Sequence, residues 1–474
     1  MRRDTMAALL IACAMTSAMT GQRSEAPAFK VDPAWPTIPN NWQFGQVASV
    51  AIDAQDHVWV LQRPGTLTPA EKPRAAPPLL EFDPAGKFVQ AWGGPGEGYE
   101  WPNSEHGVYV DPKGFVWIGG NGDNDHQILK FTKAGTFVMQ IGRAGKSTGN
   151  ADTRNLNQPA DTFVYAKTNE LFVADGYGNR RVIVFDADTG VFKRMWGAFG
   201  NMPTDGAPDL SQADIGADGS PQFIQPVHAA RVSNDGLVYV SDRGGKRVQV
   251  FTIDGKFLSQ VFIGRDCKAP DCGNGTTAAS TAFSPDAAQR FLFVGNRSQA
   301  KVMVFDRKTL ALLDSFGRWG SAPGEFGTLH HMAADSKGNL YVTEVTPLKP
   351  ENRRIQKFVY VGMQAPVSQG EAAKPDLAVI NARLGNCAAD FTVADASGAP
   401  VYAATIHVRI RYGFMSVKRM DLEVGTGSDG KARVEGLPER AKPLIYDVTK
   451  NNLKAVVEQD VSTACRGTYP VTLK

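Results

Sequence analysis

The stretch Glu105-His106-Gly107-Val108-Tyr109-Val110-Asp111 decides the fold, because its histidine returns twice at the same position of a repeated unit. In each copy the histidine lies five residues before a polar turn residue, and an apolar run follows the turn. The copies are His106 with Asp111, His228 with Ser233, and His330 with Asp335. The whole chain has 7 histidines, so three of them in one register indicate a shared role.

An internal repeat of roughly 50 to 65 residues surrounds these copies. Each unit has a strand that ends in a turn such as Asp-x-x-Gly, a hydrophobic second strand and a third that ends in Phe-Asp or Phe-Thr. A shorter fourth strand often ends in Trp-Gly or Ile-Gly. Units of this size with about four short strands are typical of propeller blades. We therefore predict an all-β fold with a six-bladed β-propeller over residues 29–361, in which Phe29–Val31 supplies the last strand of blade six.

The three histidines fall in the second, fourth and sixth units. Alternate blades of a closed six-fold ring stand about 120° apart, so three imidazoles at one height would converge on the axis. One Zn²⁺ ion can use such a set of nitrogen ligands. A single histidine on an inner strand would more often be a hydrogen-bonded structural residue. The alternate-blade trio favours a metal site at His106, His228 and His330.

The second strands of three units end in a polar residue at a fixed place. Arg63, Tyr177 and Arg243 each come seventh in equivalent segments that begin at His57, Leu171 and Leu237. Inner strands face the axis, so these groups are expected to ring the same mouth as the histidines. Arginines can bind a carboxylate bidentately, and a phenol beside arginine and a divalent cation can act as a base. The alternative is that they only make salt bridges or hydrogen bonds between blades.

Composition and the N-terminus limit the possible roles. A formal charge of +3 with 42% hydrophobic and 21% charged residues describes a globular chain and gives no reason to expect a nucleic-acid partner. Arg2 and Arg3 before the apolar run Met6–Ala14 predict a signal peptide over residues 1–21 and a secreted or periplasmic protein. Leu10–Cys13 also resembles a lipobox, which would leave a lipid anchor on Cys13. No later segment approaches the ~18 to 20 apolar residues of a membrane span.

The four cysteines beyond Cys13 are an even number in a chain that we expect to be exported. We expect one disulfide between Cys267 and Cys272 and another between Cys387 and Cys465, although three pairings are open. A four-cysteine metal site is disfavoured, because the paired C-x₂-C spacing is missing.

The end of the chain has a different character. Residues 362–375 are rich in Gly, Ser, Pro and Ala and are predicted to be a linker. Residues 376–474 carry strand and turn signals that predict a small β-sandwich. Its turns at Asp395–Val401 and Ser428–Lys431 resemble those of carboxypeptidase-regulatory or transthyretin-like modules.

The propeller region resembles the peptidyl-α-hydroxyglycine α-amidating lyases, which are six-bladed propellers of the NHL-repeat type. The resemblance covers roughly Val47 to Phe358 and depends on six short motifs. These are Gln62-Arg63, His106-Gly107, Asp175-Gly176-Tyr177-Gly178-Asn179-Arg180, Pro226-Val227-His228, Asp242-Arg243 and Leu329-His330. Generic NHL propellers share the strands but not this set.

The resemblance implies a carbon–nitrogen lyase that cleaves the C-terminal α-hydroxyglycine of a peptide, or another small α-hydroxy amide, into an amide and glyoxylate. It implies that Zn²⁺ on the three histidines polarises the α-hydroxyl and that Tyr177 takes its proton. Arg63 is implied to lie beside Tyr177, and Arg243 to assist in the pocket. His331 stands where the family has an aspartate that helps to hold a structural calcium ion, which puts Ca²⁺ in doubt. His331 either points away from the axis or offers a different ligand.

Two other interpretations of the propeller stay open. The first is a non-catalytic exported NHL propeller that binds a protein or glycan on its face. The second is a propeller hydrolase such as a lactonase. It is disfavoured because such sites usually hold calcium on Glu, Asn and Asp side chains, and no such cluster repeats here.

Overall fold

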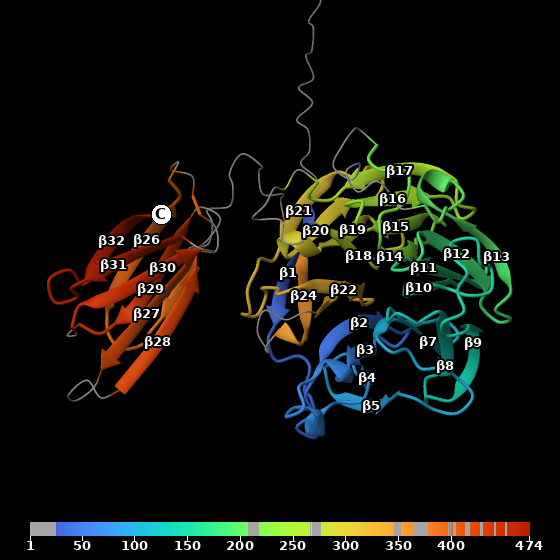
Figure 1. Cartoon of the computed structure of the whole chain (residues 1–474), viewed down its shortest axis with the longest axis horizontal. Coiled ribbons are helices and arrows are strands. Elements are labelled where there is room, and N and C mark those ends of the chain that lie inside the picture. Colours follow the sequence, from blue (N-terminus) through green and yellow to red (C-terminus); the bar gives the residue numbers. More distant parts are fainter. Residues whose placement is uncertain are drawn as a thin grey trace, which may run out of the picture. The chain divides into compact units, whose positions relative to one another are not determined.

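The computed structural model describes residues 25–474 except 207–217, 266, 268–275, 346–351, 365–377, 397, 399, 402–403, 413–417, 427–429, 440–441 and 451–452. The chain forms two compact units, residues 1–366 and residues 367–474. Within the described residues there are eight four-stranded sheets, six in the first unit and two in the second. This confirms the predicted fold class, a six-bladed β-propeller followed by a small β-sandwich (Figure 1).

Each sheet of the first unit is one blade, whose first strand lies nearest the centre of the ring (Figure 1). Blades one to three are β2 (Gln46–Ile52), β3 (Val58–Arg63), β4 (Leu79–Phe82), β5 (Phe88–Trp92); β6 (Glu105–Val110), β7 (Phe115–Gly120), β8 (Gln127–Thr132), β9 (Phe137–Gly142); and β10 (Pro159–Tyr165), β11 (Glu170–Asp175), β12 (Arg181–Asp186), β13 (Phe192–Trp196). Blades four to six are β14 (Val227–Val232), β15 (Val238–Asp242), β16 (Arg247–Phe251), β17 (Phe257–Phe262); β18 (Ala278–Phe283), β19 (Phe291–Asn296), β20 (Lys301–Asp306), β21 (Leu312–Phe316); and β22 (Leu329–Ala334), β23 (Leu340–Glu344), β24 (Ile355–Gln364), β1 (Ala26–Asp32).

Blade six takes its outer strand from the N-terminal end of the described chain. β1 pairs antiparallel with β24, with Phe29 opposite Tyr360 and Val31 opposite Phe358. The predicted closure of the ring by Phe29–Val31 is therefore confirmed. The Phe29 ring also lies 5.1 Å from the Phe316 ring of blade five, measured between centroids, so side-chain packing supports the backbone pairing.

Strand β24 is longer than the sequence suggested. We expected the propeller to end at residue 361 and a linker to begin at residue 362. Instead β24 continues to Gln364, because Gly362–Gln364 pair with Ala26–Ala28. The closing strand β1 begins three residues before the predicted Phe29 for the same reason.

The Asp-x-x-Gly turns hold a buried aromatic ring of the neighbouring strand. Asp111 accepts hydrogen bonds from the backbone amides of Lys113 and Phe115 and from Trp117 Nε1 at 2.9 Å. The Trp117 side chain is fully buried, so the carboxylate satisfies its one polar atom. The same contact recurs in blades one and six, between Asp53 and Trp59 and between Asp335 and Tyr341. The repeated aspartate therefore has a structural role.

Every inner strand carries a β-bulge close to its start. The pairing register with the second strand slips between Val47/Ser49, Glu105/Val108, Pro159/Asp161, Val227/Ala229, Ala278/Thr281 and Leu329/Met332. Bulges redirect side chains and are common near functional sites. The residues inside these bulges include His106, His228 and His330, so one repeated backbone irregularity places all three at the axis.

The second unit packs two sheets around its own apolar core. One sheet has the order β25 (Ala378–Asn381), β29 (Lys431–Leu437), β26 (Cys387–Ala394), β32 (Arg466–Thr472). The other has the order β28 (Lys418–Gly425), β27 (Thr405–Tyr412), β30 (Leu444–Lys450), β31 (Leu453–Gln459). Alternate residues of β27 and β30 point inward, including Ile406, Val408 and Tyr446.

The structure joins Cys387 and Cys465 by a disulfide across 78 residues. We expect the double variant Cys387→Ala/Cys465→Ala to lower the free energy of unfolding of the second unit by about 2 to 4 kcal/mol, because a loop of this length gains much conformational freedom when it is opened. Urea unfolding of the full chain, followed by circular dichroism, measures the change. An unchanged unfolding curve for the double variant would contradict this expectation.

Other predictions fall on residues outside those described. The signal peptide (residues 1–21), the Cys13 anchor and most of the linker lie there, and so does Cys272, the expected partner of Cys267. Among the described residues, no helix has the length and apolar character needed to cross a membrane.

Candidate metal centre

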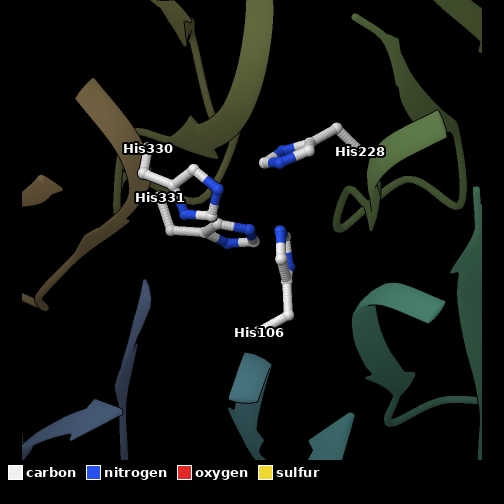
Figure 2. Close-up of side chains that lie close together, drawn as sticks. All are labelled: His106, His228, His330 and His331. Atoms are coloured by element: carbon white, nitrogen blue, oxygen red, sulfur yellow. The ribbon is translucent and has the colours of Figure 1, made fainter. Parts of the chain in front are cut away.

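Four histidines meet on the propeller axis, and we call them the axial histidine cluster: His106, His228, His330 and His331. One ring nitrogen from each lies within 4.8 Å of the corresponding nitrogens of the others, and all four side chains are buried. Figure 2 shows the four rings directed toward one another. The structure thus brings together the three histidines selected from the sequence and adds a fourth.

The neighbouring blades hold three of the rings by their Nδ1 atoms. His106 Nδ1 lies 2.7 Å from the carbonyl oxygen of Ala160, and His330 Nδ1 lies 2.6 Å from that of Ala48. His228 Nδ1 contacts the carbonyl oxygen of Ala279 in the same way. Even-numbered blades therefore supply the imidazoles, and the bulges of odd-numbered blades supply the carbonyls that orient them.

These contacts assign the proton of each ring. A carbonyl oxygen can only accept, so Nδ1 must donate. The proton is therefore on Nδ1, and Nε2 on the other side of the ring carries an unprotonated lone pair. Metal-binding histidines commonly use such a backbone contact to fix their tautomer and orientation. The three Nε2 atoms can therefore act as ligands without further rearrangement of protons.

The charge state of the cluster also suits a cation. Burial lowers the pKa of His106, His228, His330 and His331 well below its usual value. Nearby arginines lower the pKa of these histidines further. The four rings are therefore neutral at pH 7, and a metal ion does not have to displace protons from them. Imidazole nitrogens suit transition metals such as zinc, whereas calcium prefers oxygen, so this cluster fits a transition metal and not Ca²⁺.

Tyr177 stands at the cluster with its hydroxyl group. The hydroxyl oxygen lies 2.9 Å from His106 Nε2 and 3.2 Å from His228 Nε2. Arg243 Nη1 donates to the same oxygen at 3.1 Å, and the guanidinium carbon lies 5.3 Å from the centroid of the phenol ring. Tyr177 therefore has two potential metal ligands on one side and a permanent cation on the other.

The structure places Arg63 differently from Arg243. Arg63 donates to the Glu105 carbonyl oxygen at 2.5 Å, to Gln46 Oε1 at 3.2 Å and to Asn121 Oδ1 at 3.0 Å. It links blades one and two and acts on Tyr177 through its charge. The residue in direct contact with Tyr177 is Arg243, whereas the resemblance implied Arg63.

The pairing register also corrects the equivalence that we drew between these residues. Val47 pairs with Gln62, Pro159 with Asp175 and Val227 with Asp242, so the next residues, Arg63, Gly176 and Arg243, are the structural equivalents. Tyr177 is one position further along. The sequence comparison counted seven residues from His57, Leu171 and Leu237. It missed the shift because these three residues do not stand at equivalent positions of their strands.

The same register identifies Arg297, which the sequence analysis missed. Ala278 pairs with Asn296, so Arg297 is the blade-five equivalent of Arg63 and Arg243. Burial and the nearby charge of Arg243 lower the pKa of Arg297 to about 10, so Arg297 stays protonated at neutral pH. The signal was present in the sequence as an arginine directly after the second strand of the unit.

A second group of possible ligands, Asp53, His57 and Glu81, lies in blade one. Its groups are already engaged with one another and with their surroundings. Asp53 binds Lys133 at 2.6 Å and Trp59, and His57 Nδ1 lies 2.6 Å from Glu81 Oε1. This group forms part of the turn structure and offers no free coordination site comparable to the axial cluster.

The fold and the site define a class of protein: a six-bladed β-propeller with a buried axial cluster that could hold a metal ion. No family model matches the chain. NHL repeat-containing protein 3 of Mus musculus is 28% identical over 294 residues, which are 60% of this chain and 71% of that protein.

Amidating enzymes are also similar to the chain. Peptidyl-glycine alpha-amidating monooxygenase B of Xenopus laevis is 26% identical over 360 residues, 69% of this chain and 36% of that protein. A probable peptidyl-alpha-hydroxyglycine alpha-amidating lyase of Caenorhabditis elegans is 30% identical over 148 residues, 31% of this chain and 36% of that protein. The resemblance to NHL-repeat propellers and to the amidating lyases is thereby confirmed. The chain spans about a third of the length of these amidating enzymes.

Proposed function

We propose that the protein is a zinc-dependent carbon–nitrogen lyase that cleaves an α-hydroxyglycine-type substrate into an amide and glyoxylate. The observation that carries this proposal is the position of the Tyr177 hydroxyl, between the Nε2 atoms of His106 and His228 and the guanidinium of Arg243. A base, a set of metal ligands and a carboxylate-binding cation are all needed for this reaction, and here they lie in mutual contact.

The proposed reaction balances without any co-reactant. A substrate of the form R–CO–NH–CH(OH)–COO⁻ loses the proton of its α-hydroxyl, the oxygen electrons form the C=O bond of glyoxylate, and the C–N pair leaves with the amide. The amide nitrogen then gains one proton, so no proton is consumed overall. Zn²⁺ held by the Nε2 atoms of His106, His228 and His330 would act as a Lewis acid on the α-hydroxyl.

The chain's own residues have separate tasks in this proposal. Tyr177, with its negative charge stabilised by Arg243, takes the hydroxyl proton and is close enough to return it to the leaving nitrogen. Arg243 and Arg297 bind the substrate carboxylate. Their Nε atoms are both buried and have no hydrogen-bond partner within the described part of the chain. Arg63 holds the wall between blades one and two and adds positive charge.

The similarity to amidating enzymes supports the reaction class, and the arginines of the site support the substrate class. A site with several arginines suits a small anionic substrate or the C-terminal carboxylate of a peptide. We expect no nucleic-acid partner and no structural Ca²⁺ in the axial cluster. We also propose that the protein is secreted or periplasmic. The Cys387–Cys465 disulfide is compatible with that location.

A second candidate is a non-catalytic NHL propeller that binds a protein or glycan partner. The similarity to NHL repeat-containing protein 3 favours it. The two candidates differ in what they require of the axis. A binding propeller needs no metal and would release no glyoxylate from α-hydroxyhippurate, a simple α-hydroxyglycine compound.

The variant Tyr177→Phe tests the assignment of the base. We expect it to keep its metal and to lose glyoxylate release from α-hydroxyhippurate by roughly 10²- to 10⁴-fold in kcat, the usual contribution of a general base. Tyr165→Phe is the matched control. Tyr165 is in the same blade, but its hydroxyl donates to the Asn234 carbonyl oxygen at 3.4 Å and takes part in none of the contacts described above for the axial histidine cluster. Full activity in Tyr177→Phe would contradict the assignment.

A further inference from the structure

His331 is a buried imidazole without a hydrogen bond. Its side chain is fully buried, and neither Nδ1 nor Nε2 has a partner in the described part of the chain. Burial of a polar atom without a hydrogen-bond partner lowers the stability of the folded protein. The other three histidines of the cluster each use Nδ1 to bind a carbonyl oxygen. Among the described residues, no group therefore compensates for the burial of His331.

The bulge of blade six contains two residues, and this explains why His331 points to the axis. Neighbouring side chains of a regular strand alternate between its two faces. In β22 the register slips between Leu329 and Met332, so two residues, His330 and His331, lie within the bulge. In blades two and four the residue after the histidine is small, Gly107 or Ala229. Blade six therefore carries a ring at a position where blades two and four have no large side chain.

The rings of the cluster surround a common centre. The His331 centroid lies 4.9 Å from that of His330, 5.1 Å from His228 and 5.4 Å from His106. Figure 2 shows His331 on the same side as His330 and directed toward the other two rings. The ring nitrogens face one another, yet within the described part of the chain no hydrogen bond joins His331 to the other three rings. The lone pairs of facing nitrogens repel each other. A cation at the centre removes this conflict.

We propose that His331 is a fourth imidazole ligand of the ion held by His106, His228 and His330. This rests on the metal-binding part of the proposed function and not on the reaction. Four nitrogen donors fill the positions of a tetrahedral ion. A substrate hydroxyl can then reach the ion only as a fifth ligand, and the site suits ions that accept five ligands. The bound class is a divalent transition metal, with Zn²⁺ and Co²⁺ as probes.

X-ray absorption of the unmodified full-length protein loaded with Zn²⁺ or Co²⁺ counts the ligands directly. We expect four imidazoles per metal ion. A count of three would overturn the inference and leave the three-histidine site intact. If chelator-treated protein takes up neither ion, both this inference and the proposed function are wrong.

Two variants add an independent test. His331→Leu and His331→Gln are each expected to weaken Co²⁺ binding roughly 10-fold or more and to change the visible absorption of the bound Co²⁺, because one nitrogen is lost. His126→Leu is the matched control, since His126 is a buried histidine outside the cluster whose ring accepts from the Ser147 amide. Spectra and affinities of both His331 variants equal to those of the control would overturn the proposal.

Discussion

Replacing His228 by alanine is expected to remove the bound metal and to reduce glyoxylate release to the background rate. His228 lies in β14, its Nδ1 contacts the Ala279 carbonyl, and its Nε2 faces both the cluster and Tyr177. The substitution removes one ligand and the partner of the tyrosine together. Metal ions contribute several kcal/mol to such reactions, so the rate is expected to fall roughly 10³-fold or more.

Metal content and activity of His228→Ala must be measured on the same preparation. His126→Ala is the control for the loss of a buried imidazole, and we expect it to retain metal and activity. Circular dichroism establishes that the propeller is folded in each variant. A folded His228→Ala protein with full metal content and normal turnover would contradict the assignment of His228 as a ligand.

The second large effect is expected on stability, at a fully buried ion pair in blade three. Arg181 and Asp175 are both completely buried, and Arg181 Nε lies 2.8 Å from Asp175 Oδ2. The guanidinium also donates to the carbonyl oxygens of Asn150, Asp152 and Asn155. Arg181→Met leaves the buried Asp175 carboxylate without a compensating positive charge and three carbonyl oxygens without this donor, and we expect the free energy of unfolding to fall by about 3 to 5 kcal/mol.

This pair also supports the site. Asp175 accepts from the Asn157 amide at 2.7 Å and lies two residues before Tyr177. Urea unfolding measures the stability, and Lys113→Met is the control, because Lys113 pairs with Asp188 on the surface and such pairs contribute about 0 to 1 kcal/mol. If Arg181→Met is no less stable than Lys113→Met, the ion pair does not have this role.

Much of the propeller could be predicted because its signals are local. Apolar alternation and Asp-x-x-Gly turns are visible in a few consecutive residues, and the spacing of these signals along the chain gives the repeat period. Phe29–Val31 fitted the missing strand of blade six. The convergence of His106, His228 and His330 also followed from their shared position in alternate units. These predictions required only that the blades close into a ring.

The details of the site depend on bulges, which have no simple sequence signal. The wide bulge at Leu329/Met332 brings His331 beside His330, and the sequence alone left the direction of His331 open. The pairing register, which the sequence does not show, decides which residues are equivalent at the end of each second strand. Tyr177 is one position beyond the equivalents of Arg63 and Arg243, and Arg297 went unnoticed although it follows Asn296 as Arg243 follows Asp242. The contact partner of an arginine, such as Tyr177 for Arg243, depends on the three-dimensional arrangement of the blades.

The central claim is that the axial histidine cluster holds one metal ion. Elemental analysis of the purified protein beside the double variant His106→Ala/His228→Ala tests this most directly. We predict about one zinc per chain in the unmodified protein and none in the folded double variant. Zinc retained in the double variant, or an unmodified protein that binds none even when zinc is supplied, would contradict the account.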